Sequence, residues 1–389
     1  MSRPLSEELA LQHKVLHICL SRGWGGLEMY PVRIIPELVR QGWRAYVLTL
    51  EGTRLAQALA DSKAVEVRSV RSPSRALWQL PALVRWLRRR GIGVVHCHKS
   101  SDLRLGALLK CLCPELRLIF TDHMGVTRPK HDPYHRWVYR RVNRVLSISE
   151  ATLARNRKAF PLPASRITPL YLGVDTARFT PRLEAVERQA LRDGLGIPRE
   201  AVAIALPGRL TPGKGQQVLL DAFMRLVDAG DRQSHLVLIG GLEAGEGGNP
   251  TFIASLRQQV AERGLQDRVT FTGFRRDLAR LFEVLDIVCV PSRNEAFGLT
   301  VIEAMAAGKA VVGADSGAIP ELIGAGCGRL VDPQDPAAWA ATLRELRDAP
   351  ALREQLGTAA RRLANARFTL AKHVTGLRAV YEDIDQPWR

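Results

Sequence analysis

The chain has 389 residues, which suits two domains, and its 46% hydrophobic and 24% charged residues exclude disorder, collagen and coiled coil. Six cysteines are too sparse for a disulfide scaffold, and Glu7 and Glu8 precede the first apolar run, so we expect no signal peptide and a reducing cytoplasm. No uncharged apolar run approaches the roughly 18–20 residues that cross a bilayer, which excludes a transmembrane helix but leaves peripheral membrane contact open.

The net charge of +17 is confined to one half of the chain. Residues 1–180 hold 30 Lys and Arg against 13 Asp and Glu, whereas residues 181–389 hold 26 of each. The first half therefore suits an anionic partner, which could be nucleic acid, a phosphorylated glycolipid or an acidic membrane surface.

Short apolar runs alternate with longer amphipathic stretches along both halves. Such runs predict strands buried on both faces of a parallel sheet, with helices between them. In the first half we expect strands at 15–20, 45–50, 94–96 and 118–121, and helices at 29–41, 77–90 and 103–111. In the second half we expect strands at 202–207, 235–240, 269–272, 287–290 and 310–313, and helices at 217–229, 250–263, 300–307 and 337–347.

The fold class predicted by this alternation is α/β, with one doubly wound parallel sheet in each half. Turn residues place the boundary within 175–197. Ligands of such sheets bind beyond the carboxyl ends of the strands, so the chemistry is expected in the loops there.

A glycine-rich turn follows the first strand of each half. Ser21 to Glu28 contains Gly23, Gly25 and Gly26, and its backbone can approach a phosphate at a helix N-terminus, although a purely structural turn explains it equally well. Gly208 to Gly215 carries Arg209 and Lys214, which together can neutralise a diphosphate but are spaced wrongly for a P-loop. Two solvated surface cations are the alternative.

The most informative stretch is Pro291 to Ala310. Two carboxylates, Glu295 and Glu303, stand eight residues apart around a glycine turn and a helix start. Carboxylates suit sugar and ribose hydroxyls, and the free N–H groups between them suit a phosphate.

With these motifs the sequence resembles the retaining glycosyltransferases of the GT-B fold, family 4, over almost its whole length. The parts that carry the resemblance occur in family order: Gly25-Gly26-Leu27-Glu28, Thr121-Asp122-His123, Ser147-Ile148-Ser149-Glu150, Gly173-Val174-Asp175, Gly208-Arg209-Leu210 with Lys214-Gly215, Gly273-Phe274, and Glu295 with Glu303.

The resemblance implies a role for each matching position. Arg209 and Lys214 resemble the pair that holds the donor diphosphate, Glu303 the carboxylate on the nucleotide ribose, and Glu295 the one near the donor sugar. His123 resembles the histidine beside that sugar. The remaining implied nucleotide-sugar contacts are Gly25, Gly26, Gly273, Phe274, Phe297, Gly298, Leu299 and Thr300.

The same resemblance implies an acceptor-binding N-terminal Rossmann-like domain at 1–178 and a donor domain at 185–367, with a helix at about 368–389 packing back on the first domain. It implies retention without an enzyme nucleophile, a UDP- or GDP-linked sugar as donor, and no cofactor. Because Arg209, Lys214 and helix N–H groups can balance the diphosphate, and because an Asp-x-Asp pair is absent, we expect no catalytic metal.

Two features depart from the pattern or resist assignment. Leu172 stands where many family members carry Asn before Gly-Val-Asp, so any role of that side chain is lost or moved. His96-Cys97-His98 looks like part of a metal cluster but has no second ligand group at zinc-like spacing, which favours strand-end histidines.

The acceptor follows from the basic half. Arginines interleaved with Trp78, Trp86 and Trp137 suit helices at an anionic membrane surface, or ordinary helices whose tryptophans face the core. We expect a saccharide or glycolipid acceptor, lipid-linked or phosphorylated as in lipopolysaccharide or cell-surface polysaccharide synthesis, at the inner leaflet.

Three alternatives remain at the sequence level. A GT-B sugar-nucleotide epimerase or phosphorylase shares the architecture, and a catalytically inactive scaffold would keep the fold without the charged site. A nucleic-acid-binding protein could use the basic half, but no nucleic-acid motif is evident and no nucleic-acid partner is expected.

Overall fold

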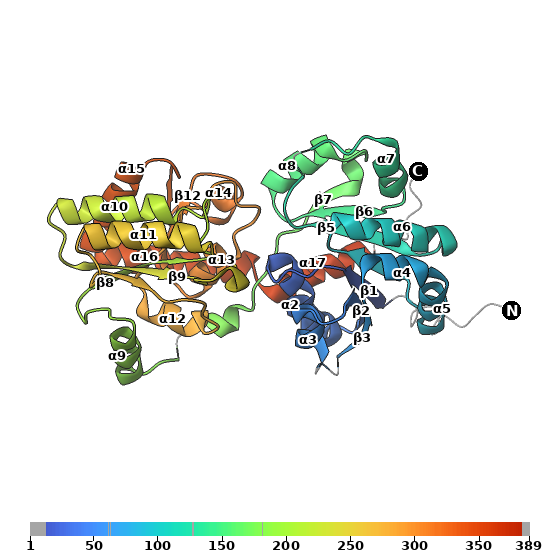
Figure 1. Cartoon of the computed structure of the whole chain (residues 1–389), viewed down its shortest axis with the longest axis horizontal. Helices are drawn as coiled ribbons and strands as arrows, with labels where there is room; N and C mark the ends of the chain where they lie inside the picture. The colour runs from blue at the N-terminus through green and yellow to red at the C-terminus, as the bar shows by residue number, and fades with distance from the viewer. Residues whose placement is uncertain (1–12, 61, 63, 127, 181, 383–389) are drawn as a thin grey trace. The chain divides into compact units, whose positions relative to one another are not determined.

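The computed structural model describes residues 13–60, 62, 64–126, 128–180 and 182–382. The chain folds as two compact units: an N-terminal unit that runs to Leu172 and resumes at Leu370, and a C-terminal unit, Gly173–Thr369 (Figure 1). Of the expected range 1–178, residues 1–12, 61, 63 and 127 lie outside the described residues, and so do residues 383–389 of the expected range 368–389.

The N-terminal unit contains a seven-stranded parallel sheet of order β3-β2-β1-β4-β5-β6-β7. Its strands are β1 (Lys14–Cys19), β2 (Arg44–Leu50), β3 (Val65–Val70), β4 (Val94–Cys97), β5 (Arg117–Asp122), β6 (Arg144–Ser147) and β7 (Ile167–Pro169). Its helices are α2 (Gly26–Arg40), α3 (Arg54–Ala60), α4 (Pro73–Trp78), α5 (Leu80–Arg90), α6 (Leu103–Leu112), α7 (Pro133–Tyr139), α8 (Glu150–Ala159) and α17 (Leu370–Glu382).

The C-terminal unit contains a six-stranded parallel sheet of order β10-β9-β8-β11-β12-β13. Its strands are β8 (Val202–Pro207), β9 (Ser234–Ile239), β10 (Val269–Phe271), β11 (Ile287–Val290), β12 (Ala310–Ala314) and β13 (Arg329–Val331). Its helices are α9 (Ala185–Gly194), α10 (Gln216–Asp228), α11 (Pro250–Glu262), α12 (Leu278–Val284), α13 (Leu299–Ala306), α14 (Ile319–Leu322), α15 (Pro336–Asp348) and α16 (Pro350–Arg367).

These two sheets confirm the predicted α/β class and the doubly wound parallel architecture. The short apolar runs of the sequence form buried strands, as in β4 and β11, where every residue is buried. Alternate residues of the N-terminal strands enter different environments: Tyr46 and Leu48 join the larger core, while Ala45 and Val47 join a smaller cluster with Ile35 of α2. The sheet is therefore covered on both faces.

The expected helix over Leu77–Arg90 is two helices instead, α4 and α5, which meet at Gln79. Pro81 lies in the first turn of α5. Proline has no N–H to donate and therefore fits the start of a helix but not its interior. The sequence pattern of apolar residues did not reveal this break.

Helix α17 packs against α2 within the N-terminal unit, and the two lie side by side in Figure 1. Tyr381 and Val374 of α17 are fully buried. The guanidinium of Arg117 in β5 donates to the carbonyl of Tyr381 at 2.8 Å. The last described helix is thus an integral part of the N-terminal unit.

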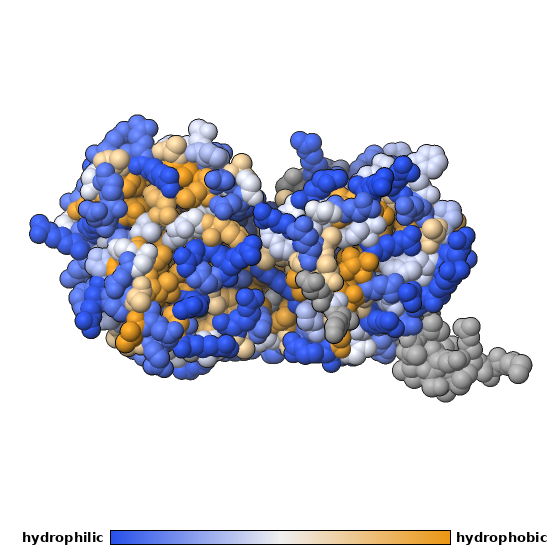
Figure 2. Space-filling model, turned by 60° about the horizontal axis from the view of Figure 1, so that its bottom comes forward, coloured by the Kyte–Doolittle hydropathy of each residue, from blue (hydrophilic) through white to orange (hydrophobic). Residues whose placement is uncertain are grey.

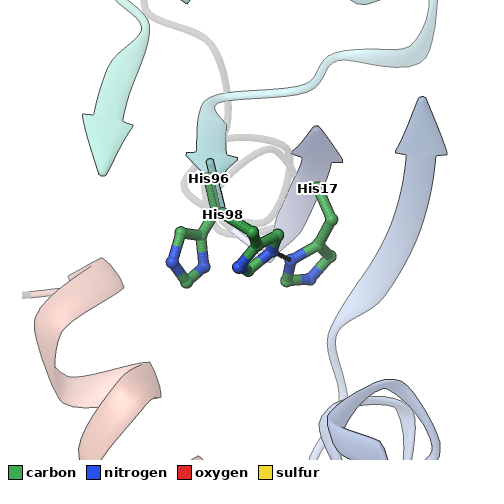
Figure 3. Close-up of side chains that lie close together, drawn as sticks. All are labelled: His17, His96 and His98. Atoms are coloured by element: carbon green, nitrogen blue, oxygen red, sulfur yellow. Dashed lines mark hydrogen bonds between the residues drawn. The ribbon is translucent and has the colours of Figure 1, made fainter. Parts of the chain in front are cut away.

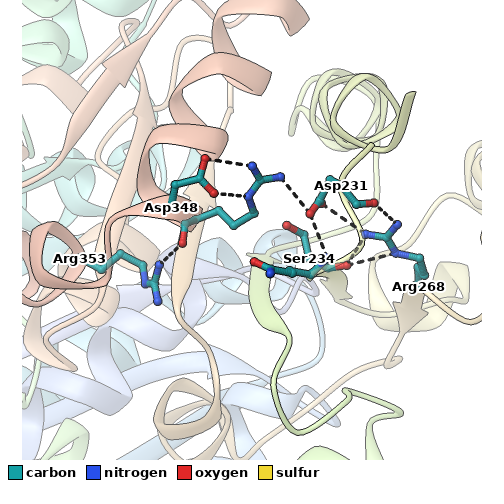
Figure 4. A network of polar contacts seen from close by, with 7 residues as sticks. Asp231, Ser234, Arg268, Asp348 and Arg353 are labelled. Carbon is teal, nitrogen blue, oxygen red and sulfur yellow. Dashed lines mark hydrogen bonds and ion pairs between the residues drawn. The ribbon is translucent and has the colours of Figure 1, made fainter. Parts of the chain in front are cut away.

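A buried polar network braces the amino-terminal edge of the C-terminal sheet (Figure 4). Asp231, whose side chain is 1% exposed, pairs with Arg268 at 3.3 Å and with Arg347 at 2.9 Å. Arg347 also pairs with Asp348 at 2.6 Å. Since ligands of such sheets bind at the opposite, carboxyl edge, we assign this network to stability.

None of the described helices is long and apolar enough to cross a membrane. The face in Figure 2 is mainly hydrophilic, with hydrophobic residues gathered in separate patches. Trp78 is 83% exposed, whereas Trp86 packs against the core and donates its indole N–H to Glu66 at 3.0 Å. Trp86 thus faces the core, whereas Trp78 is exposed, and a role for Trp78 at a membrane surface stays a prediction.

Candidate functional site

The carboxyl ends of β8, β11 and β12 carry three loops that contact one another in the C-terminal unit. These strands are neighbours in the sheet and run parallel, so the loops that follow them meet at one edge. The loops are Gly208–Gly215, Pro291–Gly298 and Asp315–Ala318. Two of them contain the expected site residues, and the third was missed.

The ammonium of Lys214 forms an ion pair with Glu295 at 2.7 Å. Their side chains are 28% and 20% exposed, so the pair is partly shielded from water. Gly215 makes this approach possible: its φ is +83°, and a Cβ there would lie 2.5 Å from the carbonyl oxygen and ring of Pro291. The structure therefore brings together two residues that the sequence placed 81 positions apart.

The third loop supports the backbone on which Glu295 stands. Ser316 Oγ accepts from the N–H of Asn294, and the N–H of Ala318 donates to the carbonyl of Glu295 at 2.9 Å. A Cβ on Gly317 would lie 2.5 Å from that same carbonyl. Asn294 is the one non-glycine residue with positive φ, 54°, in the described chain. Such strain commonly marks functional loops. A glycine shortly after a buried strand was the available signal in the sequence.

Arg209 is exposed, and its guanidinium forms no hydrogen bond or ion pair with the described residues. Its backbone carbonyl accepts from Gln216 at 2.9 Å, which fixes the start of the loop. The aliphatic stem packs over Gly247, where a Cβ would lie 3.1 Å from Arg209 Cδ. Arg209 is therefore positioned but uncompensated, as an anion-binding residue should be.

The glycine-rich loop 240–248 was missed by the sequence analysis. Gly240 lies against Gly208, since a Cβ on Gly240 would be 2.0 Å from the Gly208 carbonyl oxygen. The carboxylate of Glu246 accepts from the N–H of Leu242 at 3.1 Å. This loop follows β9, the neighbour of β8, and lies beside the Gly208–Gly215 loop at the same edge of the sheet. The high proportion of glycine in residues 240–248 was the signal in the sequence that could have identified this loop.

Helix α13 begins at Leu299 after Gly298, whose φ is +104°. Phe297 is buried and anchors the turn, and Thr300 stands in the first helical turn. The first N–H groups of a helix have no acceptor inside it and suit an anion. Glu303, half-buried, lies one turn further in. The predicted order of carboxylate, helix start and carboxylate is present.

Gly273 and Phe274 follow β10 at the same edge of the C-terminal sheet. Gly273 has φ of +74°, and the side chain of Phe274 is 47% exposed. An exposed aromatic at the carboxyl end of a strand offers a flat face to a planar ligand. The role that the resemblance implies for the pair stays a prediction.

Gly25 and Gly26 lie at the start of α2 in the N-terminal unit. Glu28 braces their turn: its carboxylate accepts from Ser21 Oγ at 2.6 Å and from the N–H of Gly25 at 2.9 Å. A Cβ on Gly26 would meet nothing within 4 Å. The hydrogen bonds of Glu28 therefore fix the turn, while the space beside the Gly26 Cα is free of other atoms. Glu28 is thus a supporting residue rather than a free carboxylate.

His123 follows β5 and belongs to a buried layer of histidines in the N-terminal unit. We call this set the histidine layer; its members are His17, His96, His98, His123 and His373, together with Tyr30, Thr121 and Tyr381. All eight are at most 9% exposed. The sequence analysis singled out His96, His98 and His123, the last in one motif with Thr121, but missed the other four.

Strand register explains how the layer forms. His17 of β1 is the register partner of His96 of β4. Their neighbours Leu16, Ile18 and Val95 belong to the larger core on the other face, so both histidines point to the side on which α2 packs. Period-two alternation on adjacent strands was the sequence signal for His17. Nothing local in the sequence indicated His373.

Two sets of hydrogen bonds within the layer join α17 to the sheet and to α2. His96 Nδ1 lies 2.6 Å from the hydroxyl of Tyr381, and His96 Nε2 lies 2.7 Å from Thr121 Oγ1. The Tyr30 hydroxyl lies 2.8 Å from His373 Nε2. His373 Nδ1 donates to the carbonyl of Tyr171 at 2.7 Å, so His373 Nε2 must accept from Tyr30.

Burial keeps these histidines neutral. It lowers the pKa of His17 and of His123 to about 3 and that of His373 to about 4. The pKa values of His96 and His98 also fall well below the ordinary value, mainly through burial. A neutral imidazole can donate one hydrogen bond and accept another, which fits the contacts between neighbouring rings.

His17, His96 and His98 come close enough together to be considered as metal ligands, with one nitrogen from each within 4.8 Å of the others (Figure 3). The spacing along the sequence indicated no further ligand near His96 and His98. In the folded chain His17 supplies one, so that expectation is wrong. However, both nitrogens of His96 already face hydroxyl groups. The absence of a catalytic metal stays a prediction.

Comparison with known proteins places these features in a family. Residues 187–363 match the family model of glycosyl transferases group 1, and residues 24–178 match that of glycosyltransferase family 4. A D-inositol 3-phosphate glycosyltransferase of Corynebacterium efficiens is 30% identical over 391 residues, covering 92% of this chain and 90% of that protein. The chain belongs to the group 1, family 4 glycosyltransferases.

Other relatives vary in how much of their length is matched. The lipopolysaccharide core biosynthesis mannosyltransferase LpcC of Rhizobium leguminosarum is 30% identical, covering 79% of this glycosyltransferase and 81% of that protein. A D-inositol 3-phosphate glycosyltransferase of Jonesia denitrificans is 39% identical over 215 residues, but this match covers only 54% of this chain and 50% of that protein.

Solved structures confirm the GT-B fold. A glycosyltransferase from Rickettsia africae superposes with a TM-score of 0.86 at 20% identity, covering 97% of this chain and 99% of that one. Anabaena HepE in complex with UDP and glucose superposes with a TM-score of 0.80 at 23% identity, covering 95% and 100%. The predicted family and fold are therefore both correct.

Proposed function

We propose that this glycosyltransferase moves a hexose from a UDP- or GDP-linked donor to an anionic saccharide acceptor, with retention of configuration and without a metal ion. The observation that carries the proposal is the edge of the C-terminal sheet that holds the Lys214–Glu295 pair, the start of α13 and Arg209, whose guanidinium has no partner in the described part of the chain. These groups together suit a diphosphate flanked by hydroxyl groups.

The donor half of the reaction follows from the charges. Arg209 and the first N–H groups of α13 bind the diphosphate, Glu303 accepts from ribose hydroxyls, and Phe274 contacts the base. Because Lys214 is already neutralised by Glu295, a diphosphate must compete for its ammonium. When Lys214 turns to the phosphate, the carboxylate of Glu295 is released and can accept hydrogen bonds from the sugar.

The chemical step breaks the bond between the anomeric carbon and the diphosphate oxygen. The acceptor oxygen bonds to the same face of an oxocarbenium-like centre, and the acceptor proton passes to the leaving phosphate. The protein contributes positioning and charge stabilisation rather than a nucleophile. His123 contacts the donor sugar, and Gly25 and Gly26 approach the diphosphate.

The basic N-terminal unit supports an anionic acceptor. One relative is named for D-inositol 3-phosphate and another for the lipopolysaccharide core, which makes phosphorylated or lipid-linked saccharides the class to examine first. A surface groove of about 790 Å³ between α6 and α7 contains Lys110, Arg136, Arg140 and Arg141 beside Trp137. We propose that this groove lies at the inner leaflet of the cell membrane.

The donor proposal is tested by thermal stability with UDP, GDP, ADP and their sugar conjugates. A ligand at 100 times its Kd stabilises the folded state by about 2.7 kcal/mol. We expect a shift with UDP or GDP that Arg209→Ala abolishes. Arg199→Ala is the matched control because Arg199 is exposed and precedes β8 at the opposite edge. No shift with any nucleotide would contradict the proposal.

The reaction itself is tested by incubating the protein with the donor so identified and a panel of phosphorylated saccharides. We expect a glycoside whose anomeric configuration, read by NMR, equals that of the donor. A free epimer or a sugar phosphate as product would instead identify an epimerase or a phosphorylase. Unchanged turnover after chelation of divalent ions is expected, and loss of activity would refute metal independence.

Membrane contact is tested by cosedimentation with vesicles of phosphatidylglycerol and phosphatidylcholine at low salt. We expect binding to the anionic vesicles that weakens in the double variant Arg136→Ala/Arg140→Ala. The control, Arg199→Ala/Arg225→Ala, removes the same charge from exposed arginines of the C-terminal unit. Equal binding of both variants would contradict the assignment of the groove.

A further inference from the structure

Three histidines form a linear chain that ends at His123. His17 Nδ1 lies 3.0 Å from His98 Nε2, and His98 Nδ1 lies 3.4 Å from His123 Nε2. The rings of His17 and His98 are nearly parallel, at 16°, which suits a hydrogen bond in the ring plane. Figure 3 shows the bond between His17 and His98, with His96 to one side.

Each neutral imidazole carries a single N–H, so this chain has only two possible directions. In one, His17 donates to His98 and His98 donates to His123. In the other, every bond is reversed and His123 donates from Nε2. The groups at the two ends decide between these directions.

The inner end of the chain is His17 Nε2, which is buried and has no hydrogen-bond partner among the described residues. If the chain ran from His123 to His17, this nitrogen would carry a buried proton without an acceptor. Buried N–H groups without a partner are rarer in proteins than unpaired acceptors. The structure therefore favours the direction from His17 to His123, in which Nε2 of His17 holds only a lone pair.

The outer end is open. His123 is 9% exposed, and its Nδ1 forms no hydrogen bond with the described residues and is not among the buried unpaired atoms. Water or a ligand can satisfy that nitrogen whether it donates or accepts. The outer end therefore does not favour either direction of the chain. The unpartnered Nε2 of His17 at the inner end determines the direction.

The other polar groups of the histidine layer cannot reverse the chain. Tyr30 packs against the ring of His123 at 4.8 Å, but its hydroxyl hydrogen is committed to His373, because His373 Nδ1 must donate to the Tyr171 carbonyl. His96 is bonded to Thr121 and Tyr381. Among the described residues, only His98 touches the Nε2 of His123 through a hydrogen bond.

We infer that His17 and His98 are positioning residues that hold His123 in the tautomer protonated at Nδ1, so that His123 presents a hydrogen-bond donor to an oxygen of the sugar donor. This inference rests on the proposed function for the identity of the ligand, but not for the tautomer. With its lone pair occupied by His98, His123 does not act as the base that removes the acceptor proton.

The tautomer is read directly by NMR of protein labelled with ¹⁵N-histidine. Long-range ¹H–¹⁵N spectra distinguish a protonated ring nitrogen from one that carries a lone pair, and His123→Asn assigns the signals of His123. We expect Nδ1 protonated and Nε2 unprotonated in His123 at neutral pH. Protonation at Nε2 would overturn the inference without any reference to activity.

The same spectra test the competing metal site. We expect addition of Zn²⁺ to leave the ring signals of His17, His96 and His98 unchanged. Stoichiometric zinc binding that shifts all three would show that the cluster is a metal centre and that the hydrogen-bonded chain is wrong. His131→Gln, at an exposed position, is the control for nonspecific zinc binding.

Two variants of His98 test its role in the reaction. The amide nitrogen of Asn lies close to the place of Nδ1, and that of Gln close to the place of Nε2. We expect His98→Asn to keep the bond to His123 and most of kcat. We expect His98→Gln to lose it and to lower kcat roughly three- to tenfold, as for one hydrogen bond, with KM for the acceptor unchanged.

The outcomes separate the inference from the proposed function. Equal losses in both variants, at matched thermal stability, would mean that His98 is merely structural. If the unaltered protein transfers no sugar from any nucleotide donor, the proposed function fails, while the NMR result still decides the tautomer. If a variant does not fold, the spectra of the unaltered protein decide alone.

Discussion

Gly215→Ala should disrupt the candidate donor site more than any other single methyl addition in its loop. Gly215 has φ of +83°, and an Ala in that left-handed conformation costs about 1–2 kcal/mol. The added Cβ would also lie 2.5 Å from the ring and the carbonyl oxygen of Pro291, and neither a proline ring nor a backbone carbonyl can move aside cheaply. Overpacking of this kind costs about 1–3 kcal/mol more.

Gly213→Ala provides the matched control. Gly213 lies in the same loop with φ of +90°, but a Cβ there would meet nothing within 4 Å. The backbone cost is therefore shared by both variants, and only Gly215→Ala adds the collision. We expect destabilisation of about 1–2 kcal/mol for the control and about 2–5 kcal/mol for Gly215→Ala.

Calorimetry of the full chain measures the two losses, and titration with UDP or GDP measures the consequence for binding. Because Gly215 adjoins Lys214 and holds it against the Pro291–Gly298 loop, we expect nucleotide affinity to fall at least tenfold in Gly215→Ala and little in the control. Equal stability and equal affinity of the two variants would refute the contact between the loops.

Three further predictions follow from the contacts described above. Glu295→Gln frees the ammonium of Lys214, so UDP or GDP without a sugar should bind severalfold more tightly by calorimetric titration; weaker binding would contradict the exchange of partners. Tyr381→Phe removes the hydroxyl that faces His96 and should destabilise the protein by about 1–2 kcal/mol in thermal unfolding, whereas Tyr134→Phe, at an exposed position, should change nothing. Burial lowers the pKa of the layer's histidines below 6.5, so the unfolded chain binds more protons than the folded one between about pH 6.5 and pH 4. Stability should therefore be fully present above pH 6.5 and fall by up to about 1.4 kcal/mol per pH unit for each such histidine as the pH drops; urea midpoints that stay flat from pH 7 to pH 5 would contradict this.

The sequence predicted the sheet edge of the C-terminal unit well because its signals are local. A buried strand followed by glycine and cations indicates a loop at a carboxyl edge, and Glu295 precedes a helix start that is visible in the pattern. The ion pair between Lys214 and Glu295 could not be predicted in the same way. It depends on Gly215 packing against Pro291, a contact between loops that strand order alone brings together.

The histidine layer could not be predicted from the sequence, because it depends on contacts between segments that are distant along the chain. Period-two alternation could have placed His17 and His96 on one face, but only if β1 and β4 were known to be neighbours. His373 lies 343 residues from Tyr30, and its position depends on α17 packing against α2. Spacing along the chain therefore made His96 and His98 look like an incomplete metal site, whereas their partners lie in segments that are distant in sequence.

The two candidate regions differ in how their charges are arranged, and this difference bears on mechanism. The C-terminal edge holds positive charge that a phosphate can engage: the guanidinium of Arg209 has no partner among the described residues, and Lys214 is paired with a carboxylate that a phosphate can replace. The histidine layer holds no net charge, because burial keeps each ring neutral, and the inferred direction of the chain from His17 to His123 leaves His123 a hydrogen-bond donor at Nδ1. A phosphate leaving group needs the first kind of site, since negative charge develops on it during bond breaking. A sugar hydroxyl needs only the second, because a neutral donor of fixed direction selects its orientation without attracting the phosphate away from the cations.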